Sequence, residues 1–161
     1  MSMSFTQRAQ KVIQDSYVVA REFSHSELTP AHVLYVAFRD QEEMVQMTFA
    51  QLGVKPSLFV GEIQKILEAL PRVSGVSEPL PGSFLNSYLD DVNKIKKELR
   101  DEYISIEHFL IAAPQTKQNS INALFKKHNL DTETLKRAVL TVRGNNRVVD
   151  ETPENKLGCA R

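Results

Sequence analysis

Histidine and cysteine are the side chains in this 161-residue chain best suited to acid–base, nucleophilic or metal chemistry near neutral pH. The chain has four histidines, His25, His32, His108 and His128, and a single cysteine, Cys159. No H-E-x-x-H or C-x-x-C motif groups them at the spacing of metal ligands. A single cysteine also excludes a disulfide within the chain. We therefore predict no metal site.

Motifs that hold phosphate groups or activate a serine are missing as well. The sequence has no G-x-x-x-x-G-K-[ST] loop, whose backbone N–H groups would cradle a nucleotide, and no G-x-S-x-G turn. We therefore expect no catalytic residue, no cofactor and no ATP hydrolysis by this chain alone. A small hydrolase is an alternative from another functional class, and the absence of a nucleophile–base pair argues against it.

His32 and His108 are predicted to support helices rather than to react. Each is expected to be the third residue of a helix, on a separate half of the duplicated fold, where a role in packing or in first-turn hydrogen bonding is favoured. His25 follows the first predicted helix, so we interpret it as a helix-end residue favoured by the helix dipole.

An internal repeat relates the segments that contain these histidines. Residues 28–34 (LTPAHVL) align with residues 104–110 (ISIEHFL), 76 positions further along the chain. The same offset, without a gap, pairs Phe49 with Phe125 and Ile63 with Val139. A shared offset over so many positions predicts two copies of one structural unit.

Each copy is predicted to contain four helices. Apolar residues recur every three or four positions in residues 5–23 and again in residues 85–99, which is the period of an amphipathic helix. Helix boundaries are expected at residues that cap, start or end helices: Thr29, Gly53 and Pro56 in the first copy, and Ser105, Asn129 and Thr132 in the second. Period-two alternation and hairpin turns are absent. The predicted fold is all-α, with eight helices in two pseudo-symmetric four-helix repeats.

Two segments are predicted to lie outside the helices. Residues 71–82 hold three prolines and two glycines, which predicts an irregular connector. Residues 146–161 are polar and lack an apolar period, which is typical of a linker or a frayed tail. Residues 1–145 are therefore expected to form one domain, with repeat one at about 5–70 and repeat two at about 83–144.

The charge balance argues against two classes of partner. Twenty Lys and Arg residues balance twenty Asp and Glu residues, so the formal net charge is zero. Without a net positive field, we expect no nucleic-acid partner and no membrane-surface partner. The N-terminus lacks the apolar stretch of a signal peptide and no apolar run is long enough to span a bilayer, so we expect a cytoplasmic location.

Several segments resemble the duplicated Clp amino-terminal (Clp repeat) domain, namely residues 5–10, 28–34 and 101–108. Residues 70–75 (LPRVSG) and 142–154 (VRGNNRVVDETPE) look like the corresponding stretches of the ClpB family of protein disaggregases. The similarity covers roughly residues 4–155, and the last five residues, LGCAR, do not follow the family.

The resemblance implies a non-catalytic, substrate-engaging N-terminal domain of a ClpB-like AAA+ disaggregase, whose partners are unfolded or aggregated proteins. It further implies a full-length ATPase that forms homohexamers and cooperates with a DnaK-type chaperone. An alternative within the same class is an adaptor-docking N-terminal domain, as in the protease-coupled Clp ATPases. The two alternatives differ in the partner expected, which is an unfolded chain in one case and a folded adaptor in the other.

The resemblance also implies a set of substrate-binding residues: Thr6, Leu89, Ile95, Asp101 and Glu107. Leu89 and Ile95 match apolar positions along a groove attributed to the family. The residues themselves leave a structural role open for the other three. Thr6 can cap the first helix, Asp101 precedes a helix, and Glu107 lies in the first turn of that helix, where the dipole favours a negative charge.

Three positions depart from the family pattern. Asp91 stands where leucine is usual, and Lys96 and Arg100 stand where small residues are usual. These changes are expected to make the groove more polar and to weaken its binding of apolar segments.

Overall fold

The computed structural model describes residues 3–75, 78–144 and 146–153. Eight α-helices lie within these residues, and each of the first four begins 76 positions before its counterpart among the last four. The helices are α1 (Gln7–Glu22), α2 (Pro30–Arg39), α3 (Glu43–Leu52), α4 (Pro56–Ala69), α5 (Ser83–Glu98), α6 (Ile106–Ala112), α7 (Asn119–Lys127) and α8 (Thr132–Arg143). The prediction of an all-α fold built from two four-helix repeats is confirmed.

The helix boundaries follow local signals in the sequence. Gly53 and Asn129 end α3 and α7 in the left-handed conformation, with φ of 71° and 58°. Pro56 begins α4, where its missing N–H leaves no bond unmade. Asp131 precedes α8, and its carboxylate accepts a hydrogen bond of 2.8 Å from the Thr134 backbone N–H.

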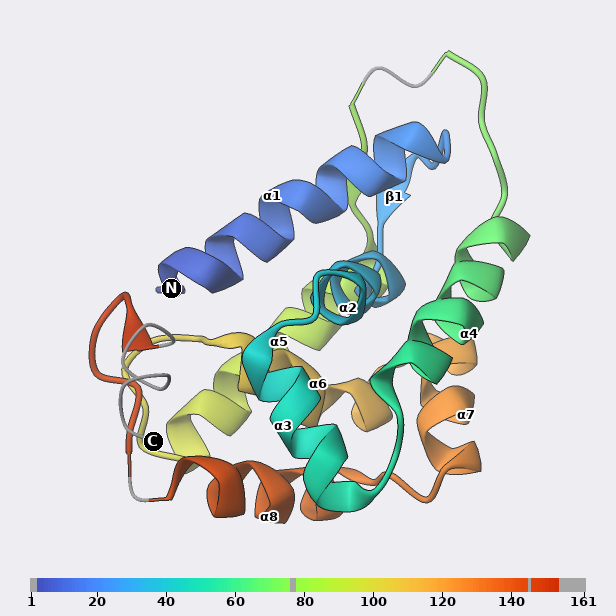
Figure 1. The fold of residues 1–161 in the computed structure, drawn as a ribbon. Helices are drawn as coiled ribbons and strands as arrows, with labels where there is room; N and C mark the ends of the chain where they lie inside the picture. Colours follow the sequence, from blue (N-terminus) through green and yellow to red (C-terminus); the bar gives the residue numbers. More distant parts are fainter. Residues whose placement is uncertain (1–2, 76–77, 145, 154–161) are drawn as a thin grey trace.

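The two second helices of the repeats form the centre of the fold. Helix α6 is buried along its whole length, and most of α2 is buried too. Helices α1 and α4 pack on α2, while α5 and α8 pack on α6 (Figure 1). The outer helices therefore need only one apolar face each, which is the amphipathic pattern that their sequences show.

A cluster of buried phenylalanines joins the two repeats. Phe38, Phe49 and Phe59 of the first repeat contact one another, with ring centroids 4.9–5.3 Å apart. Phe59 also contacts Phe125 of the second repeat, with centroids 5.1 Å apart. Aromatic pairs at these distances add stability beyond the area that they bury, so one core spans both repeats.

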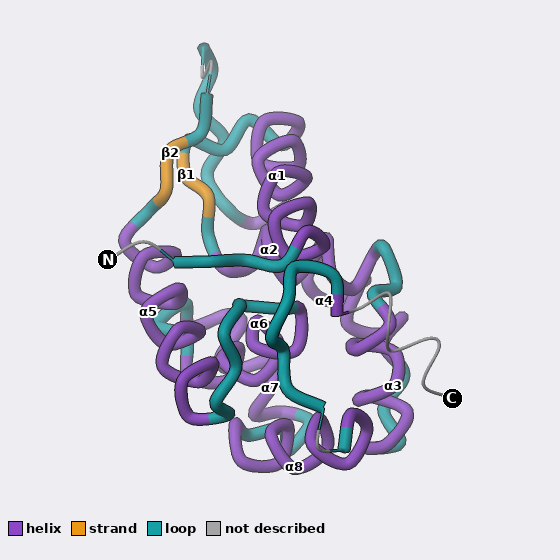
Figure 2. Tube along the Cα trace, turned by 90° about the vertical axis from the view of Figure 1, so that its left-hand side faces the viewer, coloured by secondary structure: helices purple, strands orange, loops and turns teal. Residues whose placement is uncertain are grey.

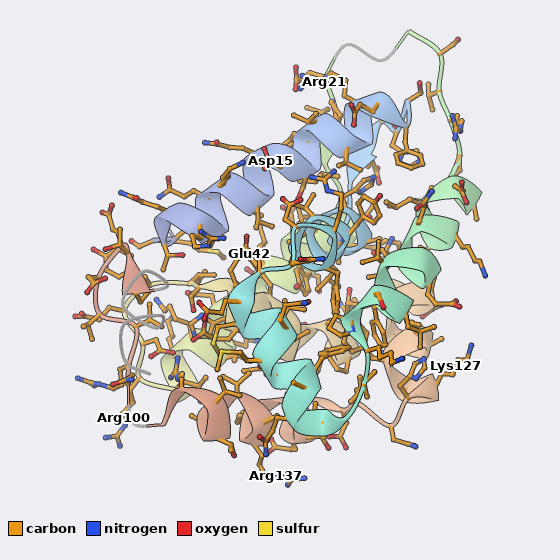
Figure 3. The ribbon with its side chains drawn as sticks, in the orientation of Figure 1. Asp15, Arg21, Glu42, Arg100, Lys127 and Arg137 are labelled. Atoms are coloured by element: carbon orange, nitrogen blue, oxygen red, sulfur yellow. The ribbon has the colours of Figure 1, made fainter. Side chains whose placement is uncertain are left out.

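Side-chain contacts also fasten α1 to the rest of the fold. Arg8 on α1 donates two hydrogen bonds, of 2.8 and 3.0 Å, to the carboxylate of Glu42 at the start of α3. Figure 3 shows Glu42 between α1 and α3. At the other end of α1, Arg21 pairs with Glu78 of the connector at 3.2 Å.

Two short features were not predicted from the sequence. Strands β1 (Glu27–Leu28) and β2 (Leu80–Pro81) pair in parallel (Figure 2), and Phe5 forms an isolated parallel bridge with Ile104. Strands of two residues are too short to show period-two alternation. A 3-10 helix, η1 (Ala113–Gln115), also follows α6, at the positions where α2 remains α-helical. It contains Pro114, which has no N–H to donate to an α-helical hydrogen bond.

Residues 146–153 differ from the expectation of a frayed tail. The Glu102 N–H donates to the Val148 carbonyl at 2.7 Å, and the Gln7 N–H donates to the Glu151 carbonyl at 2.8 Å. These bonds hold the segment against the domain. The rest of the predicted tail, with Cys159, lies outside the described residues.

Helix length and composition also bear on membrane insertion. Among the residues that the structure describes, no helix has the length and apolar character needed to cross a bilayer.

Candidate functional site

The second repeat contains a buried cluster of charged side chains between α5, α6 and α8. Asp101 lies in the loop before α6, Glu107 and His108 lie in the first turn of α6, and Arg143 ends α8. All four are at most 6% exposed. Arg143 donates to a Glu107 carboxylate oxygen at 3.0 Å and to a carboxylate oxygen of Asp101 at 3.1 Å. Two acids therefore share one arginine below the surface.

The hydrogen bonds fix the proton on His108. The Ser105 backbone N–H donates to Nδ1 of His108 at 2.9 Å, so Nδ1 is the acceptor. The proton then sits on Nε2, which donates to Asp101 at 2.7 Å. His108 and Ser105 together form a capping box at the start of α6, as the first-turn interpretation of this histidine predicts.

The charges of this cluster stabilise one another. Burial raises the pKa of the Asp101 carboxyl, but hydrogen bonds from His108, Arg143 and the Val148 N–H outweigh burial and hold that pKa below its ordinary value. Burial works to lower the pKa of Arg143, and its two carboxylate partners raise that pKa above the ordinary value. Both groups are therefore charged at neutral pH.

The first repeat has the same arrangement without the charges. The Thr29 N–H donates to Nδ1 of His32 at 3.0 Å, and Nε2 of His32 lies 2.8 Å from Nδ1 of His25. His25 thus occupies the place of Asp101. Burial, and then the neighbouring His25, lower the pKa of His32 to about 4.

The interpretation of His25 as a charged residue at a helix end is wrong. This side chain is 2% exposed, and its ring stacks on Phe23 with centroids 5.3 Å apart. Burial, and then the charge of Arg72, lower the pKa of His25. A neutral ring gains nothing from the dipole at the end of a helix.

The structure does not gather the five predicted substrate-binding residues on one surface. Four of them are at most 6% exposed: Thr6, Ile95, Asp101 and Glu107. Thr6 is the N-cap of α1, and its hydroxyl accepts a bond of 3.2 Å from the Ala9 N–H. Leu89 is half-buried against the core. Asp101, Glu107 and Thr6 therefore stabilise the fold here, and direct contact between them and a substrate stays a prediction.

Ile95 lies beneath a cleft of about 280 Å³ between α5, η1 and α8. The other lining residues are polar or charged: Asp91, Lys94, Glu98, Gln115, Thr132, Glu133 and Lys136. Lys136 crosses the cleft, 2.9 Å from Glu98 and 3.4 Å from Glu133. The cleft thus has one apolar lining residue, the buried Ile95, among seven polar or charged ones.

Among the three departures from the family pattern, one reaches this cleft. Asp91 lines it, whereas Lys96 and Arg100 do not. Burial raises the pKa of Asp91, and Lys94 opposes that shift. Asp91 therefore adds a carboxylate to the lining of this cleft.

The arrangement offers little for metal or acid–base chemistry. Within the described ranges, no group of three or more His, Cys, Asp or Glu side chains is placed to hold a metal ion. The carboxylates of Asp101 and Glu107 are occupied by hydrogen bonds and covered from solvent. Arg143, which links them, carries no sequence signal for this role because it is simply a basic residue in the last turn of a helix.

Solved structures share this duplicated helical fold. The N-terminal domain of Hsp104 from Candida albicans matches 94% of this chain and 99% of its own, with a TM-score of 0.80 and 24% identity. A structure described as a complex of the ClpV N-domain with a VipB peptide matches 85% of each chain, with a TM-score of 0.68 and 17% identity. The fold is therefore that of the N-terminal domains of Clp-type proteins.

The chain belongs to the Clp repeat (R) N-terminal domain family, whose sequence profile matches residues 4–128. Chaperone protein ClpB 2 of Thermosynechococcus vestitus is 32% identical over 96% of this chain, and mitochondrial ClpB4 of Arabidopsis thaliana is 29% identical over 94%. The chain spans only 17% and 16% of the length of these two proteins. It corresponds to the N-terminal domain of ClpB/Hsp104-type Clp ATPases.

Proposed function

We propose that this chain is the substrate-engaging domain of a ClpB-like disaggregase and binds unfolded or aggregated polypeptide without catalysing a reaction. The observation that carries this proposal is the cleft over Ile95, on the α5 helix of a chain that belongs to the Clp repeat family. The wider proposal is that residues 1–145 form this domain in a longer protein that is a homohexameric ATPase and works with a DnaK-type chaperone.

The size and lining of the cleft favour weak and unselective binding. A volume of about 280 Å³ accommodates one or two side chains rather than a folded surface. Ile95 requires no particular hydrogen bond, and the charged residues around it carry long, adaptable side chains, so we expect many sequences to bind. We expect a dissociation constant between about 1 μM and 1 mM.

A structural neighbour supports peptide binding by this fold. The ClpV N-domain is described in complex with a VipB peptide. That protein shares 17% identity with this chain, so it supports the kind of ligand and not the residues that contact it.

We place the contact with polypeptide at Ile95, which lines the cleft; Leu89 is on the same helix but does not line the cleft, and its contact with polypeptide stays a prediction. Both side chains are apolar; Ile95 is 3% exposed, so a segment in the cleft would cover only the small part of it that is still accessible. Thr6, Asp101 and Glu107 serve this site through the fold, because their side chains are engaged in hydrogen bonds within the protein.

The sharpest test is a substitution that should strengthen binding while the variant's NMR spectrum stays that of the folded domain, since loss of the cleft cannot raise affinity at the cleft. Asp91→Leu removes a charge that a bound apolar segment would desolvate, so it should tighten binding of an unfolded client. Asp90→Leu is the matched control, because Asp90 is exposed, precedes Asp91 directly and does not line the cleft. The measurement is an NMR titration of each variant with a permanently unfolded model protein.

Two outcomes would overturn the assignment. Equal tightening by Asp91→Leu and Asp90→Leu would show a general response to surface hydrophobicity. Chemical-shift changes away from α5 and α8 would place the contact elsewhere.

We also expect binding to change little with salt, because salt screens charge pairs but does not screen the burial of apolar area. Strong weakening by salt, or tight binding only to a folded adaptor, would favour the adaptor-docking alternative.

A further inference from the structure

Residues 146–153 lie over the buried charged cluster. The Val148 N–H donates to Asp101 Oδ1 at 2.8 Å, and the Val148 carbonyl accepts from the Glu102 N–H at 2.7 Å. The Val148 side chain is 3% exposed. Further along, the Glu151 carbonyl accepts from the Gln7 N–H at 2.8 Å, at the start of α1.

The segment adds to a layer that already contains the N-terminal residues. Phe5 and Ile104 form a parallel bridge, with the Thr6 N–H donating to the Ile104 carbonyl at 2.9 Å and the Ile104 N–H donating to the Ser4 carbonyl at 2.8 Å. Figure 2 shows the N-terminal segment, the α5–α6 loop and the chain after α8 together on one face. Asp101 is thus the side chain that joins this layer to the buried cluster beneath it.

We propose that Asp101, Glu107 and Arg143 are positioning residues that fasten residues 146–153 to the domain as a strap beside the start of α1. Arg143 and His108 hold the Asp101 carboxylate in place, and its Oδ1 atom then receives the Val148 N–H. The Arg143–Glu107 pair keeps the arginine from turning away. This inference does not depend on whether the cleft binds polypeptide.

The first repeat provides an internal comparison. His32 caps α2 with the same bond that His108 makes at α6, so the cap does not require a buried ion cluster. At the positions equivalent to Glu107 and Arg143, 76 residues earlier, the first repeat has Ala31 and Leu67, which are both fully buried. The extra charges therefore occur in the repeat whose last helix is followed by the strap.

The test separates the strap from overall stability in the 161-residue chain. Val149 is 46% exposed on the strap, and the chain has no tryptophan, so Val149→Trp adds a unique fluorescent reporter at an accessible position. In that background, Asp101→Asn removes the negative charge of the side chain that accepts the Val148 N–H. Val148→Gly removes the buried side chain of the strap and leaves the side chains of the charged cluster unchanged. Amide exchange of Val148 and Glu102 gives a second readout.

Two matched controls separate the effects of charge and of stability. Asp91→Asn removes a carboxylate that lies in the cleft rather than under the strap. Ile63→Val weakens the core of the first repeat, where Ile63 is fully buried.

We expect Asp101→Asn and Val148→Gly to speed exchange of the two amides about 10-fold or more, since a hydrogen bond to a charged group is lost or loosened. The fluorescence anisotropy decay of the tryptophan should gain a fast component. Exchange of the backbone amides in α2 and α6 should change much less. The controls should leave the strap protected. If both strap variants are folded and keep slow exchange and slow anisotropy decay, or if Ile63→Val loosens the strap equally, the proposal is wrong.

Discussion

His25 and Asp101 occupy the same place in the two repeats, 76 positions apart, and each pairs with the Nε2 nitrogen of the histidine that caps the next helix. The distances are 2.8 Å from His25 to His32 and 2.7 Å from Asp101 to His108. One repeat therefore buries a pair of neutral rings, and the other buries a histidine with a carboxylate. Both repeats are expected to lose stability in acid, the first through uptake of protons by histidines of the unfolded chain and the second through protonation of Asp101, whose folded-state pKa is lowered.

The histidine pair should make the protein less stable between pH 6.5 and about 4. The folded-state pKa of His32 is lowered from 6.5 to about 4, so below pH 6.5 the unfolded chain takes up a proton that the folded protein excludes. Stability is complete above about pH 6.5 and falls with pH, by at most roughly 3 kcal/mol from this residue. Urea unfolding at several pH values measures the effect.

His32→Asn provides the control, because the amide oxygen of asparagine can still accept the Thr29 N–H but does not titrate. The variant should lose much of the pH dependence between 6.5 and 4. Parallel losses in the parent and the variant would mean that another group is responsible.

Replacing members of the buried ion cluster by the residues of the first repeat should cost less than additively when both are replaced together. Glu107→Ala should cost about 3 kcal/mol, because Arg143 loses one of its two buried carboxylates. Arg143→Leu should cost at least as much. The double variant, which carries the first repeat's Ala31 and Leu67 at these positions, should cost less than the sum by about 1 kcal/mol or more. A thermodynamic cycle from chemical unfolding checks this, and strict additivity would contradict it.

Thr6 should affect stability and leave client binding unchanged. Thr6→Ala removes the hydroxyl that accepts the Ala9 N–H, at a cost of about 1 kcal/mol. Asp131→Ala removes the equivalent cap of α8 and is the matched control. We expect both variants, compared at a temperature where both are folded, to bind an unfolded client as the parent does. Selective loss of affinity in Thr6→Ala would show that Thr6 contacts the client.

Tyr88 should be the last of the four tyrosines to ionise. Its hydroxyl donates to the Phe109 carbonyl inside the core, and burial raises its pKa well above the ordinary value. In an alkaline titration followed by ultraviolet absorbance, one tyrosine should ionise only as the protein unfolds. Tyr88→Phe should remove that late step, and a titration unaltered by this substitution would assign the step to another tyrosine.

The sequence predicts the helices well because their signals are local. Gly53 and Asn129 mark helix ends through backbone conformation, and Thr29 and His32 cap α2 across only three positions. The repeat itself was detectable because equivalent helices keep the same offset. Each of these inferences needs only a few neighbouring residues, or one comparison along the chain.

The candidate site was harder to predict because it depends on distant contacts. Asp101 and Arg143 are 42 positions apart, and neither type of residue indicates that the other will be its partner. Periodicity identifies Ile95 as part of an apolar face, but it cannot say how much of that face other helices cover. The strap was missed because a polar segment without an apolar period can still be held by backbone hydrogen bonds and one buried valine.

The shared core has a consequence for how such a molecule could have arisen. Phe59 packs on Phe125 across the repeats, and the Ala31 N–H at the start of α2 is satisfied by Gln118 of the other repeat at 2.9 Å. A half-length ancestor would have exposed that aromatic face, so it could persist only as a pair of identical chains. Fusion of the two genes made their association independent of protein concentration. It also allowed the two copies to differ at equivalent positions, with the His25–His32 pair in one and Asp101, Glu107 and Arg143 in the other.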